Sequence, residues 1–201
     1  MKKIGVLGSG AVGRTLAEGF EKLGFSVMLG TGHPNKLSNW QSGINGKVGS
    51  FQRAADFGDL IVLAVKGSAA LTVTEQVKGS IGGKTVLDTT NPISDDQPTK
   101  GALTYFTGPE ESLMEKLQEV APDAHFVKAF SCVKSDSMVN PKAKPKPEMF
   151  ICGNEESAKA EALEILKMFG YTGKDSGGAS EARAIEPLAK NLYVSGSDKK
   201  N

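Results

Sequence analysis

The sequence has few of the features that mark secreted, membrane or nucleic-acid-binding proteins. Its two cysteines, Cys132 and Cys152, are spaced for neither a metal site nor a disulfide framework, which fits a reducing compartment. The longest apolar runs, such as Leu60–Val65, are far shorter than the roughly 20 residues of a membrane helix. Met1-Lys2-Lys3 leads straight into a predicted strand without an export signal, so we expect a cytoplasmic protein.

Positively and negatively charged residues are nearly equal in number, which argues against nucleic acid or a membrane surface as a partner. A formal net charge of +1 gives no general attraction to nucleic acid or to a membrane surface. The chain has two histidines, neither of them between Leu60 and Val120, so no metal site and no catalytic histidine are expected there. We therefore expect small-molecule partners, and leave open whether the chain forms a homodimer.

Length and composition favour one domain. The 201 residues, 39% of them hydrophobic, are enough to bury one core and require no second one. We predict a single dinucleotide-binding domain over 1–201, with a core part at 1–134 and a C-terminal extension at 147–192. The segment Asn140–Pro147, with three prolines and three lysines, is expected to be a loop within that domain.

Hydrophobic periodicity predicts strands that alternate with helices. Ile4–Leu7 is an apolar run, Val12, Leu16, Phe20 and Leu23 follow at helical spacing, and Phe25–Leu29 is the next strand. Further strands are predicted at 47–50, 60–65, 85–88, 125–130, 149–152 and 171–174, and further helices at 112–120, 155–169 and 180–192. This order predicts an α/β Rossmann-type fold, a doubly wound and mostly parallel sheet with a short C-terminal α/β extension.

A glycine-rich turn follows the first strand. The pattern G-x-G-x-x-G is formed by Gly8, Ser9, Gly10, Ala11, Val12 and Gly13. Between a strand and a helix, such glycines give a tight turn, close approach of a pyrophosphate and close packing of helix on strand. Backbone N–H groups at the start of the helix then meet the phosphates. The context therefore predicts dinucleotide binding rather than a merely tight turn.

The segment after the second strand favours NADP over NAD. An NAD site usually has an acidic residue about 20 residues past the glycines, yet no Asp or Glu lies between Glu21 and Asp56. The segment offers Thr31, Gly32, His33 and Lys36 instead, and these could surround a 2′-phosphate. The alternative is that Thr31 only caps the next helix and that Lys36 is solvated.

The order of motifs resembles a known family. The glycine turn, the loop from Gly30 to Lys36, Asp88-Thr89-Thr90-Asn91-Pro92, Val127-Lys128-Ala129-Phe130, Met149 to Asn154 and Asp175 to Gly178 occur in sequence. They are similar to the coenzyme F420-dependent NADP oxidoreductases, a family related to the ferric-reductase domain of STEAP proteins. The resemblance covers about residues 4 to 192.

This resemblance implies hydride transfer between NADP(H) and a flat deazaflavin (F420) or flavin, with little need for acid or base groups. It places the nicotinamide at Ala64, Val65, Lys66, Asn91, Pro92 and Ala129. It places the second ring system near Phe130, Ser131, Cys132 and Val133. Holding the two rings at near-attack distance would be most of the catalysis, so no catalytic side chain is assigned.

Three departures from the family pattern limit what the resemblance implies: the first bears on binding of the 2′-phosphate, and the last bears most on the acceptor. Gly32 stands where the family usually has arginine, Ser131-Cys132 replaces the common Asn-Thr pair, and the chain stops soon after Tyr193. Alternatives that stay open are a non-catalytic NADP-binding sensor or partner module and a flavin-linked ferric reductase. Cys132 is expected to be a small buried strand residue, with a redox-active thiol as the alternative.

Overall fold

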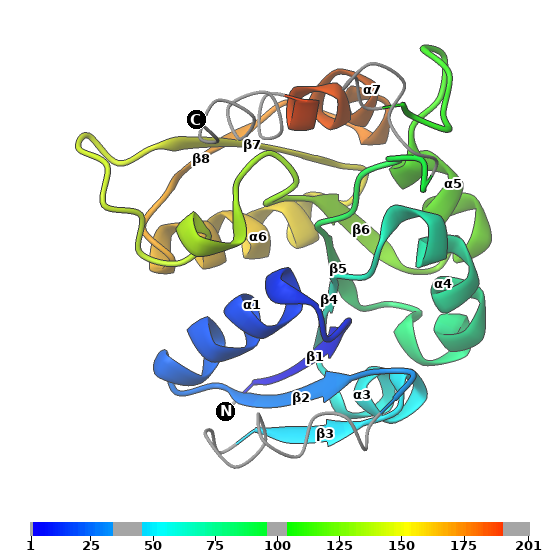
Figure 1. Ribbon diagram of the computed structural model, residues 1–201, viewed down its shortest axis with the longest axis vertical. Helices are drawn as coiled ribbons and strands as arrows, with labels where there is room; N and C mark the ends of the chain where they lie inside the picture. The colour runs from blue at the N-terminus through cyan, green and yellow to red at the C-terminus, as the bar shows by residue number, and fades with distance from the viewer. Residues whose placement is uncertain (1, 34–45, 96–103, 191–201) are drawn as a thin grey trace, which may run out of the picture.

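The computed structural model describes residues 2–33, 46–95 and 104–190, and these form one sheet with helices on both faces (Figure 1). The strands are β1 (Lys3–Leu7), β2 (Ser26–Gly30), β3 (Lys47–Gly49), β4 (Leu60–Leu63), β5 (Thr85–Asp88), β6 (His125–Lys128), β7 (Glu148–Gly153) and β8 (Thr172–Asp175). The helices are α1 (Ala11–Lys22), α3 (Phe51–Phe57), α4 (Gly67–Ile81), α5 (Leu113–Val120), α6 (Glu156–Met168) and α7 (Ala182–Ile185). The predicted α/β class is confirmed.

The strand order β3-β2-β1-β4-β5-β6-β7-β8 is that of a doubly wound sheet. The first six strands are parallel, and Leu7 at the end of β1 is in register with Gly30 of β2 and Leu63 of β4. The chain therefore winds outward in both directions from β1. In such sheets ligands bind outside the carboxyl ends of the strands at this switch point.

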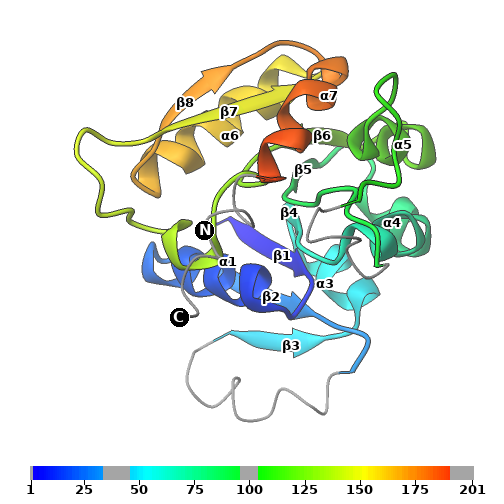
Figure 2. The same cartoon turned by 45° about the horizontal axis from the view of Figure 1, so that its top comes forward.

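Each face of the sheet has its own apolar layer. Helices α1 and α6 cover one face, whereas α3, α4 and α5 cover the other (Figures 1 and 2). Strands β4 and β5 are buried along their whole length, and the continuous apolar sequence of β4 is typical of a parallel strand covered on both sides. The core thus holds the strand ends rigidly, and the loops that follow them inherit that geometry.

The C-terminal extension adds two strands to the same sheet. Strand β7 is antiparallel to β6, with Val127 opposite Gly153, and β8 runs parallel to β7. Phe169, at the end of α6, lies against Phe20 of α1 with ring centroids 4.8 Å apart and against Phe130 at 5.8 Å. The extension and the first helix therefore share one core.

Two local predictions need correction. The single helix predicted over 180–192 is wrong: the segment forms a 3₁₀ turn at Ala179–Glu181, the short α7 and a second 3₁₀ turn at Glu186–Ala189. Pro187 has no N–H to donate, so a continuous α-helix cannot pass through it. The predicted strand 125–130 ends at Lys128 because Phe130 has a positive φ of 60°.

No helix in the three described ranges is long and apolar enough to span a membrane.

The shared aromatic core predicts that the chain unfolds as one unit. Replacing Phe169 by alanine is expected to lower the free energy of unfolding by about 3–5 kcal/mol, because it opens a cavity between α1 and α6. Phe150→Ala is the matched control, since that ring is 48% exposed, and it should cost less than about 1 kcal/mol. Calorimetry and circular dichroism should give one coincident transition; two separate transitions would contradict the single-domain assignment.

Candidate functional site

The three glycines of the phosphate turn have different surroundings. A Cβ on Gly8, whose φ is +133°, would lie 2.2 Å from the backbone oxygen of Ala64, and a Cβ on Gly13 would lie 2.0 Å from the oxygen of Gly8. Both are positions where only glycine fits without moving backbone. A Cβ on Gly10 would meet nothing within 4 Å. The space above Gly10 is therefore open, and this is where a pyrophosphate would approach.

Helix α1 presents its N-terminus to that open space. Its N-cap is Gly10, which offers no side-chain acceptor, and its first turn contains no acidic residue. The first backbone N–H groups of a helix lack intrahelical partners and carry a partial positive charge. A phosphate above Gly10 would satisfy them, so the turn fits a dinucleotide.

Thr31 lies beside this turn at the end of β2 and is buried. Its hydroxyl oxygen accepts hydrogen bonds from the Ser9 hydroxyl at 3.0 Å and from the His33 amide at 3.2 Å. The hydroxyl hydrogen of Thr31 then remains available to donate to an anion. Gly32 and His33 are exposed next to it, whereas Lys36 lies outside the described residues. These positions suit a 2′-phosphate, and no carboxylate among 26–33 repels one.

Arg14 is a residue of this region that the sequence analysis missed. Its Nε donates to the Ser9 backbone oxygen at 2.8 Å, and its exposed guanidinium has no ion-pair partner within the described part of the chain. A cation at the start of a helix is unfavourable unless an anion is near. That misplaced charge, one residue after the last glycine, is the signal that could have identified it.

The residues predicted to contact the nicotinamide follow the ends of β4 and β5. Ala64 is buried and Val65 half-buried, whereas Lys66 is exposed and its Nζ lies 3.4 Å from Asp95. Asn91 Nδ2 donates to the backbone oxygen of Ser131 at 2.8 Å. The Oδ1 of Asn91 is buried without a donor among the described residues, although buried polar atoms are normally paired. This oxygen, next to the buried Pro92, is a free acceptor for a ligand amide.

The segment predicted to face the second ring is only partly available to a ligand. Ala129, Phe130 and Ser131 are buried, and the Phe130 ring points into the core against Phe169 and Tyr171. Phe130 as a whole is 1% exposed, so its ring is not available to a substrate. Val133 is half-buried and packs against the core.

Cys132 lies in a turn rather than in the predicted strand, and it is half-buried. Its thiol donates to the backbone oxygen of Ile185 at 3.2 Å. Burial raises the pKa of this thiol above its ordinary value, so the nucleophilic thiolate is disfavoured. Its position thus indicates packing against the C-terminal segment. Cys152 is buried in the core.

A buried charge cluster beneath the strand ends was also missed. Lys128 is fully buried, and its Nζ lies 2.6 Å from Asp88 Oδ2, 2.8 Å from Glu186 Oε1 and 2.9 Å from the Thr90 backbone oxygen. Burial lowers the pKa of the ammonium, but the two carboxylates outweigh burial and the pKa is raised overall. Asp88 and Lys128 belong to the motifs Asp88-Thr89-Thr90-Asn91-Pro92 and Val127-Lys128-Ala129-Phe130. A lysine in an apolar strand is rarely buried without a charged partner, and this feature of the sequence could have indicated the cluster.

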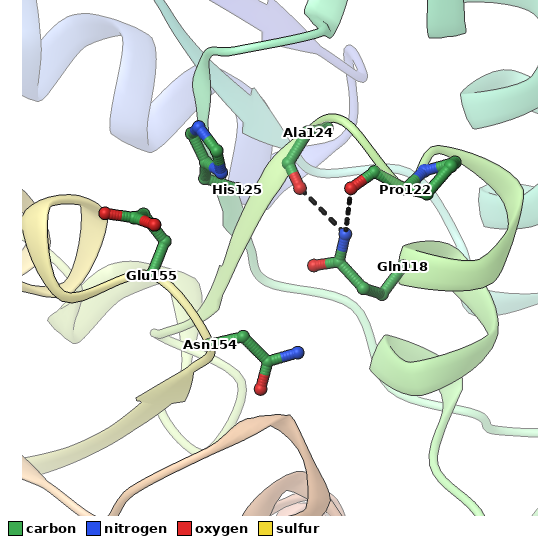
Figure 3. Close-up of a pocket in the computed structure, with 6 residues that line it drawn as sticks. All are labelled: Gln118, Pro122, Ala124, His125, Asn154 and Glu155. Atoms are coloured by element: carbon green, nitrogen blue, oxygen red, sulfur yellow. Dashed lines mark hydrogen bonds between the residues drawn. The ribbon is translucent and has the colours of Figure 1, made fainter.

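A separate hollow of about 230 Å³ lies at the opposite edge of the sheet, where β6 begins and β7 ends (Figure 3). It is lined by Gln118, Pro122, Ala124, His125, Asn154 and Glu155. The Gln118 amide nitrogen already donates to the backbone oxygens of Ala121, Pro122 and Ala124. This hollow is remote from the glycine turn. No group of His, Cys, Asp or Glu suited to a metal ion occurs within the ranges that the structure describes.

Similarity to known proteins agrees with the dinucleotide-binding turn described above. Residues 3–92 match the family model described as NADP oxidoreductase, coenzyme F420-dependent. The chain is 26% identical to the F420-dependent NADP reductase of Methanocaldococcus jannaschii, over 69% of this chain and 62% of that protein. It is also 26% identical to the rat metalloreductase STEAP3, over 96% of this chain but only 37% of the relative. The chain thus spans little more than a third of the STEAP relatives.

A solved structure extends the similarity over the whole fold. It is that of a candidate F420-dependent NADP reductase from Arthrobacter sp. FB24, with a TM-score of 0.90 and 29% identity. The match covers 98% of this chain and 95% of the other. In sequence and in fold the chain is thus similar to proteins named as NADP-dependent oxidoreductases. The resemblance to the coenzyme F420-dependent NADP oxidoreductase family is confirmed.

The different surroundings of Gly10 and Gly13 predict that a substitution at Gly10 affects cofactor binding, whereas one at Gly13 affects stability. Gly10→Ala should lower the free energy of unfolding by about 1 kcal/mol at most, because its Cβ meets no protein atom and only the N-cap preference is lost. The same variant should weaken NADPH binding at least tenfold, measured by NADPH fluorescence titration.

Gly13→Ala is the matched control within the same turn. It should cost about 3 kcal/mol or more of stability, since its Cβ overlaps the Gly8 backbone oxygen. Unchanged NADPH affinity in a folded Gly10→Ala variant would show that no phosphate approaches there.

The Thr31 hydroxyl predicts cofactor discrimination. Thr31→Val keeps the shape of the side chain but removes the donor, and should weaken NADPH binding about tenfold while NADH binding changes less than twofold. Thr31→Ser keeps the hydroxyl and should retain the preference for NADPH. Equal losses for the two cofactors in the valine variant, measured by calorimetric titration, would exclude a 2′-phosphate contact at Thr31.

Proposed function

We propose that the chain transfers a hydride between NADP(H) and a flat ring acceptor of the deazaflavin (F420) or flavin type. The observation that carries the proposal is that the open space at Gly10, the Thr31 hydroxyl and the unpaired amide oxygen of Asn91 all follow the carboxyl ends of parallel strands, and so lie along one edge of the sheet. This edge has a phosphate end and an amide end, in the order that a dinucleotide presents its parts. The relatives named for F420 and NADP support the same assignment.

At the phosphate end, the chain binds by charge and by backbone amides. The N-terminus of α1 and the open space at Gly10 would hold the pyrophosphate, and Thr31 with His33 would hold the 2′-phosphate. The exposed Arg14 guanidinium would add a cation that the Gly32 position lacks. Arginine is well suited to phosphate because its planar fork donates several hydrogen bonds at once.

At the other end, the chain orients the rings. NADPH supplies the hydride, and the residues around it need only fix its nicotinamide. Asn91 Oδ1 would accept from the carboxamide, while Asn91 Nδ2 keeps the Ser131 turn in place. Hydride transfer leaves NADP⁺ and an anionic reduced ring, and solvent can supply the proton that neutralises this ring, so no acid or base of the protein is assigned. Positioning of this kind accounts for large accelerations when two reactants are aligned.

A second candidate acceptor is a ferric chelate reduced through a flavin. Its support is the match to metalloreductases over 96% of this chain. The described residues hold no metal-ligand group, so iron would be reduced by a flavin bound at the acceptor side and not by a site within this chain. A non-catalytic NADP sensor is the third alternative, and it differs by binding NADPH without turnover.

An acceptor panel distinguishes these functions. Purified protein with NADPH should reduce F420 or FMN at least about 100-fold faster than with NADH, followed by absorbance at 340 nm and at the acceptor band. If iron is the final acceptor, a ferric chelate should be reduced only when flavin is added. Tight NADPH binding with no reduction of F420, FMN, FAD or ferric chelate would overturn the proposed reaction and favour the sensor.

A further inference from the structure

The Lys128 ammonium, at the end of β6, is bound by groups from two other segments. Asp88 and the Thr90 carbonyl belong to the end of β5, Lys128 ends β6, and Glu186 belongs to the C-terminal 3₁₀ turn. The three oxygens lie 2.6–2.9 Å from Nζ. The Thr90 carbonyl accepts a hydrogen bond from the ammonium, and the carboxylate oxygens of Asp88 and Glu186 form ion pairs with it. The side chains of all three charged residues are at most 2% exposed.

The cluster holds one cation and two carboxylates, and its remaining negative charge is met by backbone. Glu186 Oε2 accepts from the Leu113 amide at 3.0 Å, and Oε1 accepts from the Met114 amide at 3.1 Å, at the positive N-terminus of α5. Asp88 Oδ1 accepts from the amide and hydroxyl of Thr90. Every carboxylate oxygen of the cluster thus has a donor or the ammonium beside it.

Each member of the cluster lies within three residues of a residue that is hydrogen-bonded to another segment. Asn91, three residues after Asp88, donates to the Ser131 oxygen, and Ser131 comes three residues after Lys128. Cys132 donates to the oxygen of Ile185, the residue before Glu186. The charge cluster therefore ties together the end of β5, which would hold the nicotinamide, and two segments that would border the second ring, the Ser131–Cys132 turn and the C-terminal 3₁₀ turn.

Stability alone does not account for a charge cluster in this place. Burying three charged groups carries a large desolvation cost, and well-packed apolar side chains of similar volume are often as stable or more so. What apolar side chains cannot supply is directional contact, which fixes one segment relative to another. The cluster is therefore best explained by the geometry that it imposes on the strand ends.

We propose that Glu186 is a positioning residue for the acceptor: through Lys128 it holds segment 179–190 and the Ser131–Cys132 turn in place as one wall of the acceptor pocket. This proposal rests on the function proposed above. Glu186 touches neither the phosphate turn nor Thr31, so its removal should change acceptor binding and leave NADPH binding as it is.

The test compares Glu186→Gln with Glu181→Gln, a matched change at an exposed position of the same segment. In Glu186→Gln, the dissociation constant of FMN or F420 for the NADP⁺-loaded protein should rise at least tenfold. The dissociation constant of NADPH should stay within twofold, and Glu181→Gln should change neither. These are binding measurements, so they can be made whether or not turnover is found.

Hydrogen exchange gives a readout that is independent of any ligand. In Glu186→Gln, the amides of 179–190 and of Leu113 and Met114 should exchange at least tenfold faster than in the parent protein, while those of β1 and α1 stay unchanged. Uniform acceleration throughout the chain would show that Glu186 serves general stability only. Unchanged exchange at all these amides would show that Glu186 does not anchor the segment.

A double variant separates positioning from stability. Lys128→Met alone leaves two buried carboxylates uncompensated, and adding Glu186→Gln should restore part of the lost melting temperature. It should not restore acceptor affinity, because the tie between the segments is still absent. Recovery of acceptor affinity together with stability would overturn the proposal. So would a folded Glu186→Gln protein with unchanged acceptor affinity, a loss of NADPH affinity equal to that for the acceptor, or a parent protein that binds neither FMN nor F420.

Discussion

The close contact between the first turn and the end of β4 is the constraint on which the binding edge depends. Gly8 leaves β1 with a positive φ and lies so near the Ala64 backbone that no side chain fits between them. That contact sets the start of α1 over the switch point of the sheet. The helix N-terminus, Thr31 and Asn91 then share one edge, because parallel strands all end on the same side.

The two ends of this edge are built from different physical chemistry. At the phosphate end, the protein offers unpaired amides and an open space. Both features contribute little to the stability of the fold and favour binding of an anion. At the acceptor end, it offers segments that are fixed by a buried ion cluster and by a single amide donor. Under the proposed function, the first arrangement would bind by charge and the second would restrict where a ring can lie.

Most of the architecture could be predicted from the sequence. Strand positions follow from short apolar runs, and the glycine turn identified itself by its place between a strand and a helix. The exact end of β6 and the broken C-terminal helix could not be predicted with the same method. They depend on the backbone conformation of Phe130 and on one proline, which averaged periodicity does not detect. Likewise, Arg14, Asp88, Lys128 and Glu186 gain their meaning only when distant segments meet in space.

The buried charge cluster of Asp88, Lys128 and Glu186 also limits which substitutions this protein can accept over evolutionary time. A neutral residue at position 128 would leave two buried carboxylates without a cation. A neutral residue at position 186 would remove one carboxylate from the ammonium and leave the Leu113 and Met114 amides without their acceptor. Drift at any one of the positions 88, 128 and 186 is therefore costly, so substitutions there must arrive together. Related sequences should accordingly show these three positions co-varying, although they lie far apart along the chain.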